Sequence, residues 1–464
     1  MLSKAENDVL CRVGPGTPMG NLLREYWIPA LPSAEFPSPD SPPKRMRLLG
    51  ENVVMFRDTK GDVGCFVEAC PHRGASLFFG RNEDAGLRCV YHGWKYDVTG
   101  QCVDMPSEPA ESNFKSKIKV RAYPARDVNH MVWVYMGPRE TPPPFPIFEI
   151  NTLAAANVAP PNIMMEEANW MQNLEGDLDS AHIDWVHGRL SENAPAPRIG
   201  FRGLWTRDKQ PRLDIIRTDY GAFYTGKRTW DEKGTEWHRI NQFIFPFHTM
   251  ITGGEYVGLR SFVPLDDEWS MLITQVGSLA GEIAGPMRQL MSDDPFKEAG
   301  GYVKRTSDPR SYFYTVANKY NDYMRDYNEE KRSLICGIPL VGNLQDRAMT
   351  ELMTGEHGEV IYDRSHEHLG TTDAMVITVR RLLIRAAKTL EERGMVPANV
   401  DNVQLDRVRH ATLLLPKDAD WLKESEKYRD ADAGLPVANA VELIPNDDIP
   451  QPAPAIKVRQ SGVE

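Results

Sequence analysis

Two short stretches, Cys70-Pro-His72-Arg-Gly74 and Cys89-Val-Tyr-His92-Gly93-Trp94, set the architecture expected for this chain. Each stretch supplies one cysteine, one histidine after a gap of one or two residues, and then a glycine. Two thiolates and two imidazoles suit either a zinc ion or an iron–sulfur cluster. The paired stretches therefore predict a metal centre held between two similar loops.

The ligand spacing favours a cluster over a zinc ion. A single residue separates Cys70 from His72, which would crowd one tetrahedral ion. Two loops that straddle two irons fit better, with both cysteines on one iron and both histidines on the other, as a Rieske [2Fe-2S] centre requires. Gly74 and Gly93 would let backbone N–H groups approach the cluster. A structural zinc site is the alternative interpretation.

Strand patterns surround the two loops. Apolar or β-branched runs at residues 45–49, 52–57 and 63–68 predict strands, and similar runs continue to residue 135. The Pro-rich segment 141–146 predicts a stiff linker and a domain boundary. We expect a helical segment at residues 1–27 that packs on the larger of two domains, an all-β domain at 28–140, that larger domain at 141–430 and a Pro- and acid-rich tail at 431–464.

The larger domain should mix strands and helices, which makes the whole chain α+β. Residues 160–190 predict a strand followed by a helix. Residues 312–331 are polar and predict a helix, and residues 373–393 have the apolar stripe of a long amphipathic helix. Further strands are predicted at residues 213–217, 222–229, 237–246 and 270–276.

A second set of metal-binding residue types lies in Asp179-Ser-Ala-His182-Ile-Asp-Trp-Val-His187. A spacing of three predicts that Asp179 and His182 share one helix face. His187 lies about 140° further around an ideal helix, so both histidines reach one ion only if the helix ends or unwinds. Two imidazoles and a carboxylate can form a facial triad that leaves positions open on Fe(II). The spacing does not identify the third ligand, and a plain polar helix face is the alternative.

Composition narrows the class of protein. The chain has 464 residues, 41% of them hydrophobic, with 54 Lys and Arg against 65 Asp and Glu, a formal net charge of −11. This acidic balance argues against nucleic acid as the main partner. Six cysteines are too few for a disulfide scaffold and fit a reducing cytosol. The sequence lacks an apolar run long enough to span a bilayer, so we expect a cytoplasmic protein without a membrane partner.

These stretches resemble the Rieske non-haem iron ring-hydroxylating oxygenases, in particular their phthalate dioxygenase and vanillate demethylase branch. The resemblance covers residues 13–20, 24–27, both cluster loops, 169–187, 345–347 and 363–370. It implies an N-terminal Rieske domain and a C-terminal helix-grip catalytic domain. It also implies that Cys70, His72, Cys89 and His92 hold the cluster, and that His182, His187 and Asp346 hold a mononuclear Fe(II).

The resemblance further implies how the two centres cooperate. In this family each catalytic iron is served by the cluster of a neighbouring subunit, so we expect a head-to-tail homo-oligomer, a trimer or a hexamer. Asp179 would bridge His92 of one subunit and His182 of the next. The sequence shows no Gly-x-Gly-x-x-Gly motif and no second iron–sulfur cysteine set, so a separate flavin and iron–sulfur reductase should supply electrons.

The expected reaction uses O₂ and two electrons to oxidise an aromatic substrate, by ring hydroxylation or oxidative O-demethylation. Because substrates of the branch are often carboxylated, an arginine near the iron should be informative, and the candidates are Arg202, Arg207, Arg217 and Arg239. The residues predicted to contact the substrate are Asn173, Arg207, Arg239 and Phe243. The alternative functions are a Rieske electron carrier without oxygen chemistry, which would leave His182 and His187 unused, and a zinc-stabilised binding protein.

Overall fold

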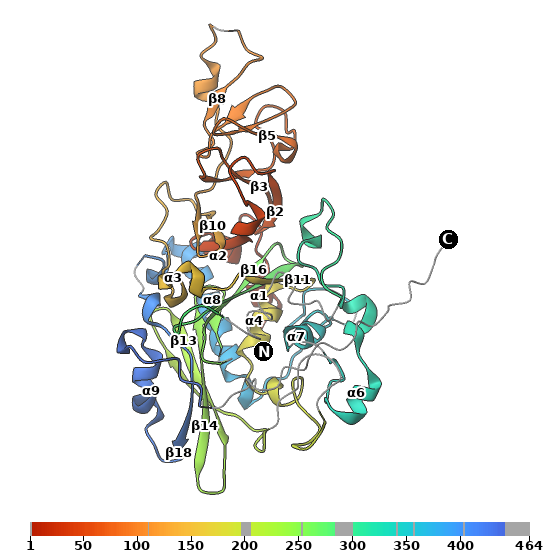
Figure 1. Ribbon diagram of the computed structural model, residues 1–464, viewed down its shortest axis with the longest axis vertical. Coiled ribbons are helices and arrows are strands. Elements are labelled where there is room, and N and C mark those ends of the chain that lie inside the picture. Colours follow the sequence, from red (N-terminus) through yellow and green to blue (C-terminus); the bar gives the residue numbers. More distant parts are fainter. Residues whose placement is uncertain are drawn as a thin grey trace, which may run out of the picture.

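The computed structural model describes residues 2–109, 111–195, 206–251, 254–283, 300–339, 342–355, 358–401 and 404–440. Figure 1 shows a narrow part built from strands, which projects from a larger body of strands and helices. Two of the expectations above fall wholly or partly outside these residues, namely Arg202 and the tail beyond residue 440.

The narrow part contains the three strands predicted between residues 45 and 68. They form one antiparallel sheet of β2 (Lys44–Leu48), β3 (Glu51–Arg57) and β4 (Val63–Val67), which confirms those predictions. A second sheet joins β1 (Trp27–Pro32), β10 (Met131–Tyr135) and β9 (Ala125–Val128). A third sheet of very short strands contains β5 (Arg81–Asn82), β6 (Leu87–Arg88), β7 (Lys95–Tyr96) and β8 (Cys102–Asp104). The second cluster loop connects β6 to β7, and the first lies between β4 and β5.

The short strands have a hydrophobic core of their own. Phe56, Phe66, Leu77 and Tyr96 are fully buried there, beneath the two cysteine-bearing loops. In Figure 1 this unit lies at the end of the molecule that is farthest from the body. A separate core therefore holds the two loops at the tip of the molecule.

The body is built on one antiparallel sheet of eight strands. Seven follow the order β11-β17-β16-β15-β14-β13-β12, and β18 pairs with β14. Their bounds are β11 Asn162–Glu166, β12 Arg212–Arg217, β13 Gly221–Thr229, β14 Thr235–Ile244, β15 His248–Met250, β16 Val257–Pro264, β17 Ser270–Gly277 and β18 Ala411–Pro416. Helices pack on this sheet, as expected for a helix-grip domain, and the α+β class is confirmed. The predicted strands are present. The strands β15, β16 and β18 were not predicted.

One long helix packs against this sheet. The helix α8 (Ala374–Arg393) confirms the predicted amphipathic segment and buries Val376, Val379 and Leu383. It contacts β12 and β13, as well as the N-terminal helices α1 (Lys4–Cys11) and α2 (Pro18–Arg24). The N-terminal helices thus pack on the body, and Arg24 of α2 also pairs with Glu51 of β3 in the narrow part, at 2.9 Å. The remaining helices are α3 (Glu149–Thr152), α4 (Trp170–Leu178), α6 (Tyr327–Arg332), α7 (Gly342–Thr350) and α9 (Trp421–Arg429).

Two predictions about helices were wrong. The segment 312–331 is mostly turns and 3₁₀ helix, with α6 at its end, because Phe313, Asp322 and Tyr323 have positive φ angles that no α-helix accepts. In addition, α4 ends at Leu178, so Asp179 and His182 do not share a helix face. Asp179 has an extended backbone, and a 3₁₀ turn (His182–Asp184) carries the histidine.

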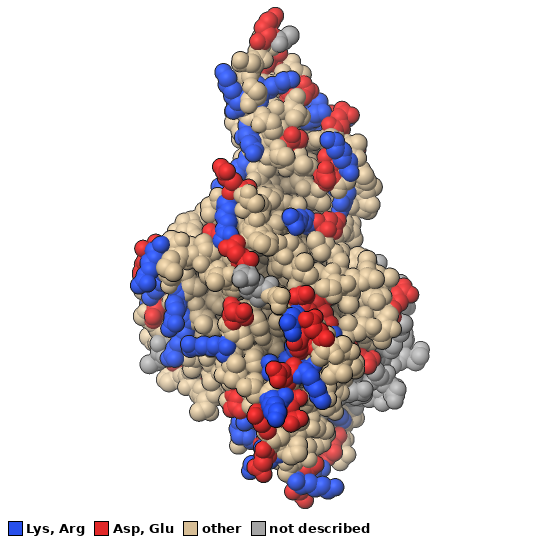
Figure 2. All heavy atoms as spheres, turned by 90° about the vertical axis from the view of Figure 1, so that its left-hand side faces the viewer, with Lys and Arg blue, Asp and Glu red and all other residues tan. Residues whose placement is uncertain are grey.

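On the face drawn in Figure 2, basic and acidic side chains are interspersed rather than gathered into one basic area. No helix in the described ranges combines the length and the apolar character that a bilayer crossing needs.

Candidate metal centres and substrate cavity

The two cysteine loops have the same backbone hydrogen bonds. The N–H of Cys70 donates to Ala75 O and the N–H of Cys89 donates to Trp94 O, both at 2.8 Å. Gly74 N–H and Gly93 N–H donate back to the carbonyl of the cysteine in their own loop, at 2.8 and 2.9 Å. Both glycines have positive φ angles, of 72° and 79°, which glycine adopts without strain. The two sequence motifs thus fold as matched turns.

The turns bring the four predicted cluster ligands to one place. Cys70 and Cys89 are 2% and 3% exposed, and the imidazole rings of His72 and His92 lie with centroids 4.4 Å apart. Trp94 stacks on His72 at 4.2 Å and fixes that ring, while Tyr96 Oη lies 3.3 Å from Cys70 Sγ. The cysteines are therefore on the buried side and the histidines on the outer side.

This arrangement does not suit a single ion. No three of the four loop residues have ligand atoms that all lie within 4.8 Å of one another. Among the described residues, the set that meets this distance lies elsewhere in the chain. The donors of the loop residues are spread more widely than one tetrahedral zinc allows. Sulfur donors on one side and imidazoles on the other fit a Rieske cluster.

The compact set is the second predicted centre, formed by His182, His187 and Asp346. Asp346 Oδ1 lies 2.9 Å from His187 Nε2 and 3.4 Å from His182 Nε2. The 3₁₀ turn after α4 brings the two histidines together, and α7, which packs on α4, supplies the carboxylate. Because α4 ends at Leu178, His182 and His187 can face the same ion, which an uninterrupted helix would not allow.

The electrostatics of this set favour a cation. Burial disfavours a charged imidazole, but the nearby carboxylates of Asp179 and Asp346 outweigh burial and raise the pKa of His182 to about 10. Burial would also raise the pKa of Asp346, yet His187 and His182 hold it well below its usual range. Two imidazoles and an ionised carboxylate that face one another are a donor set for Fe(II).

Gln345 orients His187, and sequence reasoning assigned it no role. Its side-chain Nε2 donates to Ile338 O at 2.7 Å, so its Oε1 accepts from His187 Nδ1, also at 2.7 Å. An imidazole proton therefore sits on Nδ1, and Nε2, which lies 2.9 Å from Asp346 Oδ1, is the nitrogen available to a metal ion. Gln345 directly precedes Asp346 in α7. Its position next to a candidate ligand was the feature of the sequence that could have pointed to a role for Gln345.

A buried ion pair anchors the turn that carries His182. Arg228 of β13 lies 2.6 Å from Asp184 Oδ2, with both side chains at most 1% exposed, and also donates to Ser180 O. Asp179 accepts hydrogen bonds from the N–H groups of Ala181 and His182 at 2.7 and 3.2 Å, and its Oδ2 lies 3.6 Å from His182 Nδ1. Asp179 therefore lies next to both the backbone N–H and the imidazole of His182.

A second buried network holds α4 itself. Glu175 accepts from Arg364 at 3.0 Å and from Arg380 of α8 at 2.6 Å, and Arg380 also pairs with Glu367. Two carboxylates and two guanidiniums balance in charge, as buried ionic groups require. The stretch 363–370, quoted above only for its resemblance, therefore anchors the helix that precedes the second centre.

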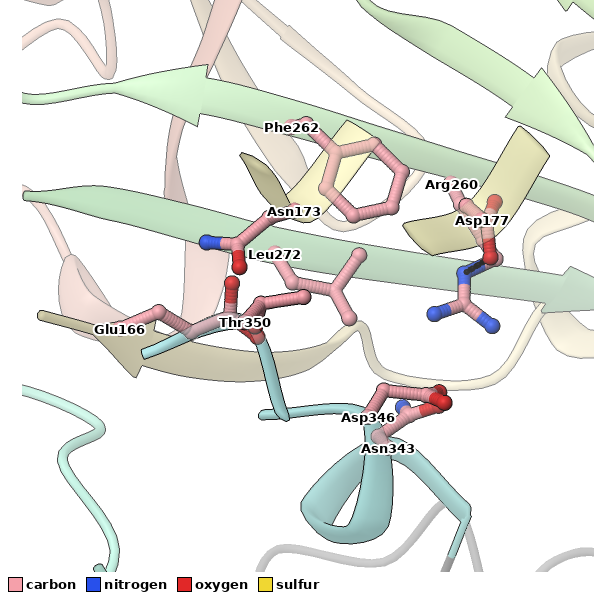
Figure 3. A pocket seen from close by; sticks show the side chains of 9 residues that line it. All are labelled: Glu166, Asn173, Asp177, Arg260, Phe262, Leu272, Asn343, Asp346 and Thr350. Carbon is pink, nitrogen blue, oxygen red and sulfur yellow. Dashed lines mark ion pairs between the residues drawn. The ribbon is translucent and has the colours of Figure 1, made fainter. Parts of the chain in front are cut away.

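A cavity opens beside Asp346, between β11, β16, β17, α4 and α7 (Figure 3). Its lining residues are Glu166, Asn173, Asp177, Arg260, Phe262, Leu272, Asn343, Asp346 and Thr350.

Of the residues predicted to contact a substrate, one lines this cavity, namely Asn173. Arg207 is exposed, and Arg217 is exposed at the end of β12. Arg239 and Phe243 are buried in β14, which does not contribute to the lining. The cavity's arginine is Arg260 and its aromatic side chain is Phe262, both on β16, a strand that the sequence did not predict.

Family comparisons agree with these centres. Residues 26–124 match the family described as Rieske [2Fe-2S] domain, and residues 134–442 match the family described as LigXa C-terminal domain like. The chain is 36% identical over 430 residues to the 3-chlorobenzoate-3,4-dioxygenase oxygenase subunit of Comamonas testosteroni, with 90% of this chain and 96% of that protein covered. It is 34% identical to the phthalate 4,5-dioxygenase oxygenase subunit of Pseudomonas putida, with 92% and 96% covered.

Solved structures show the same fold. Dicamba monooxygenase bound to dicamba superimposes with a TM-score of 0.54 at 17% identity, over 80% of this chain and 100% of that one. The 5,5'-dehydrodivanillate O-demethylase oxygenase subunit of a Sphingobium species is 36% identical over 59% of this chain and 62% of its own length. This chain therefore belongs to the Rieske non-haem iron oxygenases, as an oxygenase subunit with a Rieske [2Fe-2S] domain followed by a LigXa-type catalytic domain.

Proposed function

We propose that this oxygenase acts on an aromatic carboxylate, and that Arg260 binds the carboxylate next to the catalytic iron. The supporting observation is the position of Arg260 in the cavity that Asp346 also lines. The Arg260 side chain is 12% exposed and pairs through Nε with Asp177 at 3.3 Å. Figure 3 shows its two terminal nitrogens pointing away from Phe262, toward the side of the cavity where Asp346 lies.

The names of two relatives agree with this substrate class. Chlorobenzoate and phthalate are both aromatic carboxylates. A guanidinium that uses Nε for Asp177 still offers its terminal N–H groups, which match a carboxylate in geometry and charge. Phe262 and Leu272 add apolar side chains beside Arg260.

The ligand assignments are part of the proposal. Cys70, Cys89, His72 and His92 would hold the [2Fe-2S] cluster, and His182, His187 and Asp346 would hold Fe(II). The cluster would supply single electrons, and Fe(II) would supply O₂ activation. The protein's own contribution is to hold the His187 imidazole through its hydrogen bond to Gln345, while Asp179 Oδ2 lies 3.6 Å from His182 Nδ1.

The proposal includes electron transfer between subunits of a homo-oligomer, through Asp179. In Figure 1 the short strands of the tip lie far from α4 and α7, so the cluster of the same chain is badly placed to serve this iron. Apolar side chains are exposed near both centres, with Tyr91 57% exposed beside His92 and Trp185 55% exposed beside His182. A ring of three subunits, or two stacked rings, would cover both surfaces. A separate reductase or ferredoxin would deliver the electrons.

Substrate-dependent O₂ uptake tests this function. Holoenzyme with a reductase should consume O₂ when benzoates, phthalates or methoxybenzoates are added, and formaldehyde release separates O-demethylation from ring hydroxylation. Arg260→Met should raise KM about 10- to 100-fold for carboxylated aromatics, because a charge-assisted bond is lost. The matched control is Arg212→Met, which removes a half-exposed arginine of β12. Equal KM values in wild type and Arg260→Met would refute the assignment.

A further inference from the structure

A run of basic side chains lies on the outside of the narrow part, in the segment that follows β8. Its four exposed basic residues, which we call the basic stripe, are Lys115, Lys117, Lys119 and Arg121. The residues between the last three face inward, since Val120 is buried and Ile118 packs on the core beneath the cluster loops. Because neighbouring side chains of an extended chain point to opposite sides, this alternation directs the positive charges outward.

Backbone hydrogen bonds hold the basic stripe in place. Ile118 O accepts from the N–H of Cys102 at 3.0 Å, and the N–H of Val120 donates to Gly100 O at 2.9 Å. The stripe is therefore fixed to the same short-stranded unit that carries the two cluster loops.

Neighbouring acids do not neutralise the basic stripe. Its three lysines form no ion pair within the described ranges, and neither do the exposed Glu108 and Glu111 that precede them. Arg121 lies 3.7 Å from Glu51, but Glu51 already pairs with Arg24 at 2.9 Å. Both signs of charge are mixed over the face drawn in Figure 2, and the whole chain carries a net charge of −11, so an unpaired run of one sign is a local exception. Like charges so close together repel one another, and an acidic partner would relieve this repulsion.

Phe114 connects the basic stripe to the proposed cluster site. Its ring lies 6.0 Å from the ring of Trp94, edge to face, and Trp94 stacks on His72 at 4.2 Å. Phe114 is 41% exposed and directly precedes the stripe. Figure 1 shows β8 at the tip of the molecule, away from the body. A protein seated on the stripe would therefore touch a side chain that only Trp94 separates from a proposed cluster ligand.

The basic stripe and the proposed contact between subunits lie beside different histidines. The stripe approaches His72, through Phe114 and Trp94, whereas the proposed transfer to the neighbouring subunit uses His92. Tyr91 lies against His92, with ring centroids 4.0 Å apart. An electron could thus enter beside one histidine while the other faces the next subunit.

On the basis of the proposed [2Fe-2S] ligands, we infer that the basic stripe is the docking surface for the electron donor, and that this donor is a protein with an acidic face. The donor would lose one electron and the cluster would gain it, so no bond forms or breaks. Complementary charge raises association rate constants by about 10- to 1,000-fold, and added salt removes this gain. Attraction at the stripe would also offset the repulsion between an acidic donor and this acidic chain.

Stopped-flow reduction of the oxidised, anaerobic holoenzyme measures docking without turnover. The probe is a reduced plant-type [2Fe-2S] ferredoxin, which is an acidic protein and a stronger reductant than a Rieske centre. The rate constant, followed by the cluster absorbance, should fall about tenfold or more between about 20 mM and about 500 mM salt. Two proteins of net negative charge without such a stripe would react faster at high salt, so the direction of the salt effect is decisive.

Charge reversal tests whether the basic stripe causes this effect. The triple variant Lys115→Glu, Lys117→Glu and Lys119→Glu should lower the rate constant at low salt about tenfold or more, and its rate should no longer fall with salt. All three side chains are exposed, so the fold and the cluster absorbance should be unchanged.

The matched control makes the same change in net charge at a distant place. It combines Lys233→Glu, Lys417→Glu and Lys423→Glu, all at exposed lysines near β18 and α9. Figure 1 shows these elements at the end of the molecule opposite the tip. The control should stay within about threefold of the wild-type rate, since surface charges act over roughly the Debye length.

The outcomes distinguish this inference from the proposed function. If dithionite reduces the cluster but the ferredoxin does not, or reacts no faster at low salt, the docking surface is refuted and the proposed function stands. Equal rates for the two triple variants would also refute it. If dithionite reveals no Rieske cluster, the proposed ligands are wrong and the inference fails with them.

Discussion

Replacement of Gln345 by methionine tests how the protein prepares the catalytic metal site. Gln345 is fully buried, and its Oε1 accepts the Nδ1 proton of His187 at 2.7 Å. Methionine fills similar space but accepts a hydrogen bond poorly, so His187 loses the contact that fixes its tautomer. Loss of such a contact typically weakens metal binding 10- to 100-fold, or about 1.4 to 2.8 kcal/mol.

The assay is a competition between the enzyme and a chelator for Fe(II) or Co(II), with the cluster absorbance as an internal reference. Gln172→Met is the matched control, because Gln172 is equally buried and donates to Thr350 O at 2.9 Å without contact to a proposed ligand. We expect the control to lose stability and keep its metal affinity. Metal affinity within threefold of wild type for Gln345→Met would refute the role assigned to Gln345.

Three further predictions concern the second centre, the cluster loops and acid stability. Asp346→Ala should lose the mononuclear iron while the cluster absorbance is unchanged, as metal analysis would show. Gly74→Ala should destabilise its loop by about 1 kcal/mol because of its positive φ angle, and Gly93→Ala by more, since a Cβ there would lie 2.7 Å from Pro106 Cγ; thermal bleaching of the cluster measures both. Burial lowers the pKa of His248 to about 3, so its contribution to stability is complete above its unfolded pKa of about 6.5, and about 2 kcal/mol is lost by pH 5 as the unfolded state takes up the proton. His248→Asn should therefore lose less stability than wild type between pH 7 and pH 5 in denaturant titrations.

Each of these predictions has an outcome that contradicts it. Iron retained by Asp346→Ala would move the third ligand to another residue. Equal bleaching temperatures for the two glycine variants would show that the contact with Pro106 has no effect. An equal loss of stability in His248→Asn and wild type would assign the acid sensitivity to other groups.

The sequence predicted the metal chemistry better than the substrate chemistry. Cysteine and histidine at short, repeated spacing have few roles other than metal binding, so the Rieske domain could be identified from Cys70 to His92. The resemblance added Asp346, which spacing could not select, and the structure places it within ligand distance of both histidines. Residues that act through contacts distant in sequence, such as Gln345 with His187 and Arg228 with Asp184, have no local signature.

The substrate cavity could not be predicted because it depends on the order of strands. Arg239 and Arg260 both lie on strands of the same sheet, and sequence pattern cannot tell which strand faces α4 and α7. The sheet order places β17 between β11 and β16, and this order brings Arg260 and Glu166 to one cavity. The end of α4 was likewise misplaced, because Asp179 is held in an extended conformation by the turn it caps.

Iron and acid-labile sulfide analysis of the purified, anaerobically reconstituted chain tests the central claim most directly. Two different centres in one polypeptide predict three irons and two sulfides per chain, and two irons and two sulfides in Asp346→Ala. Zinc in either centre, or a wild-type chain that holds two irons and no mononuclear one, would contradict the account.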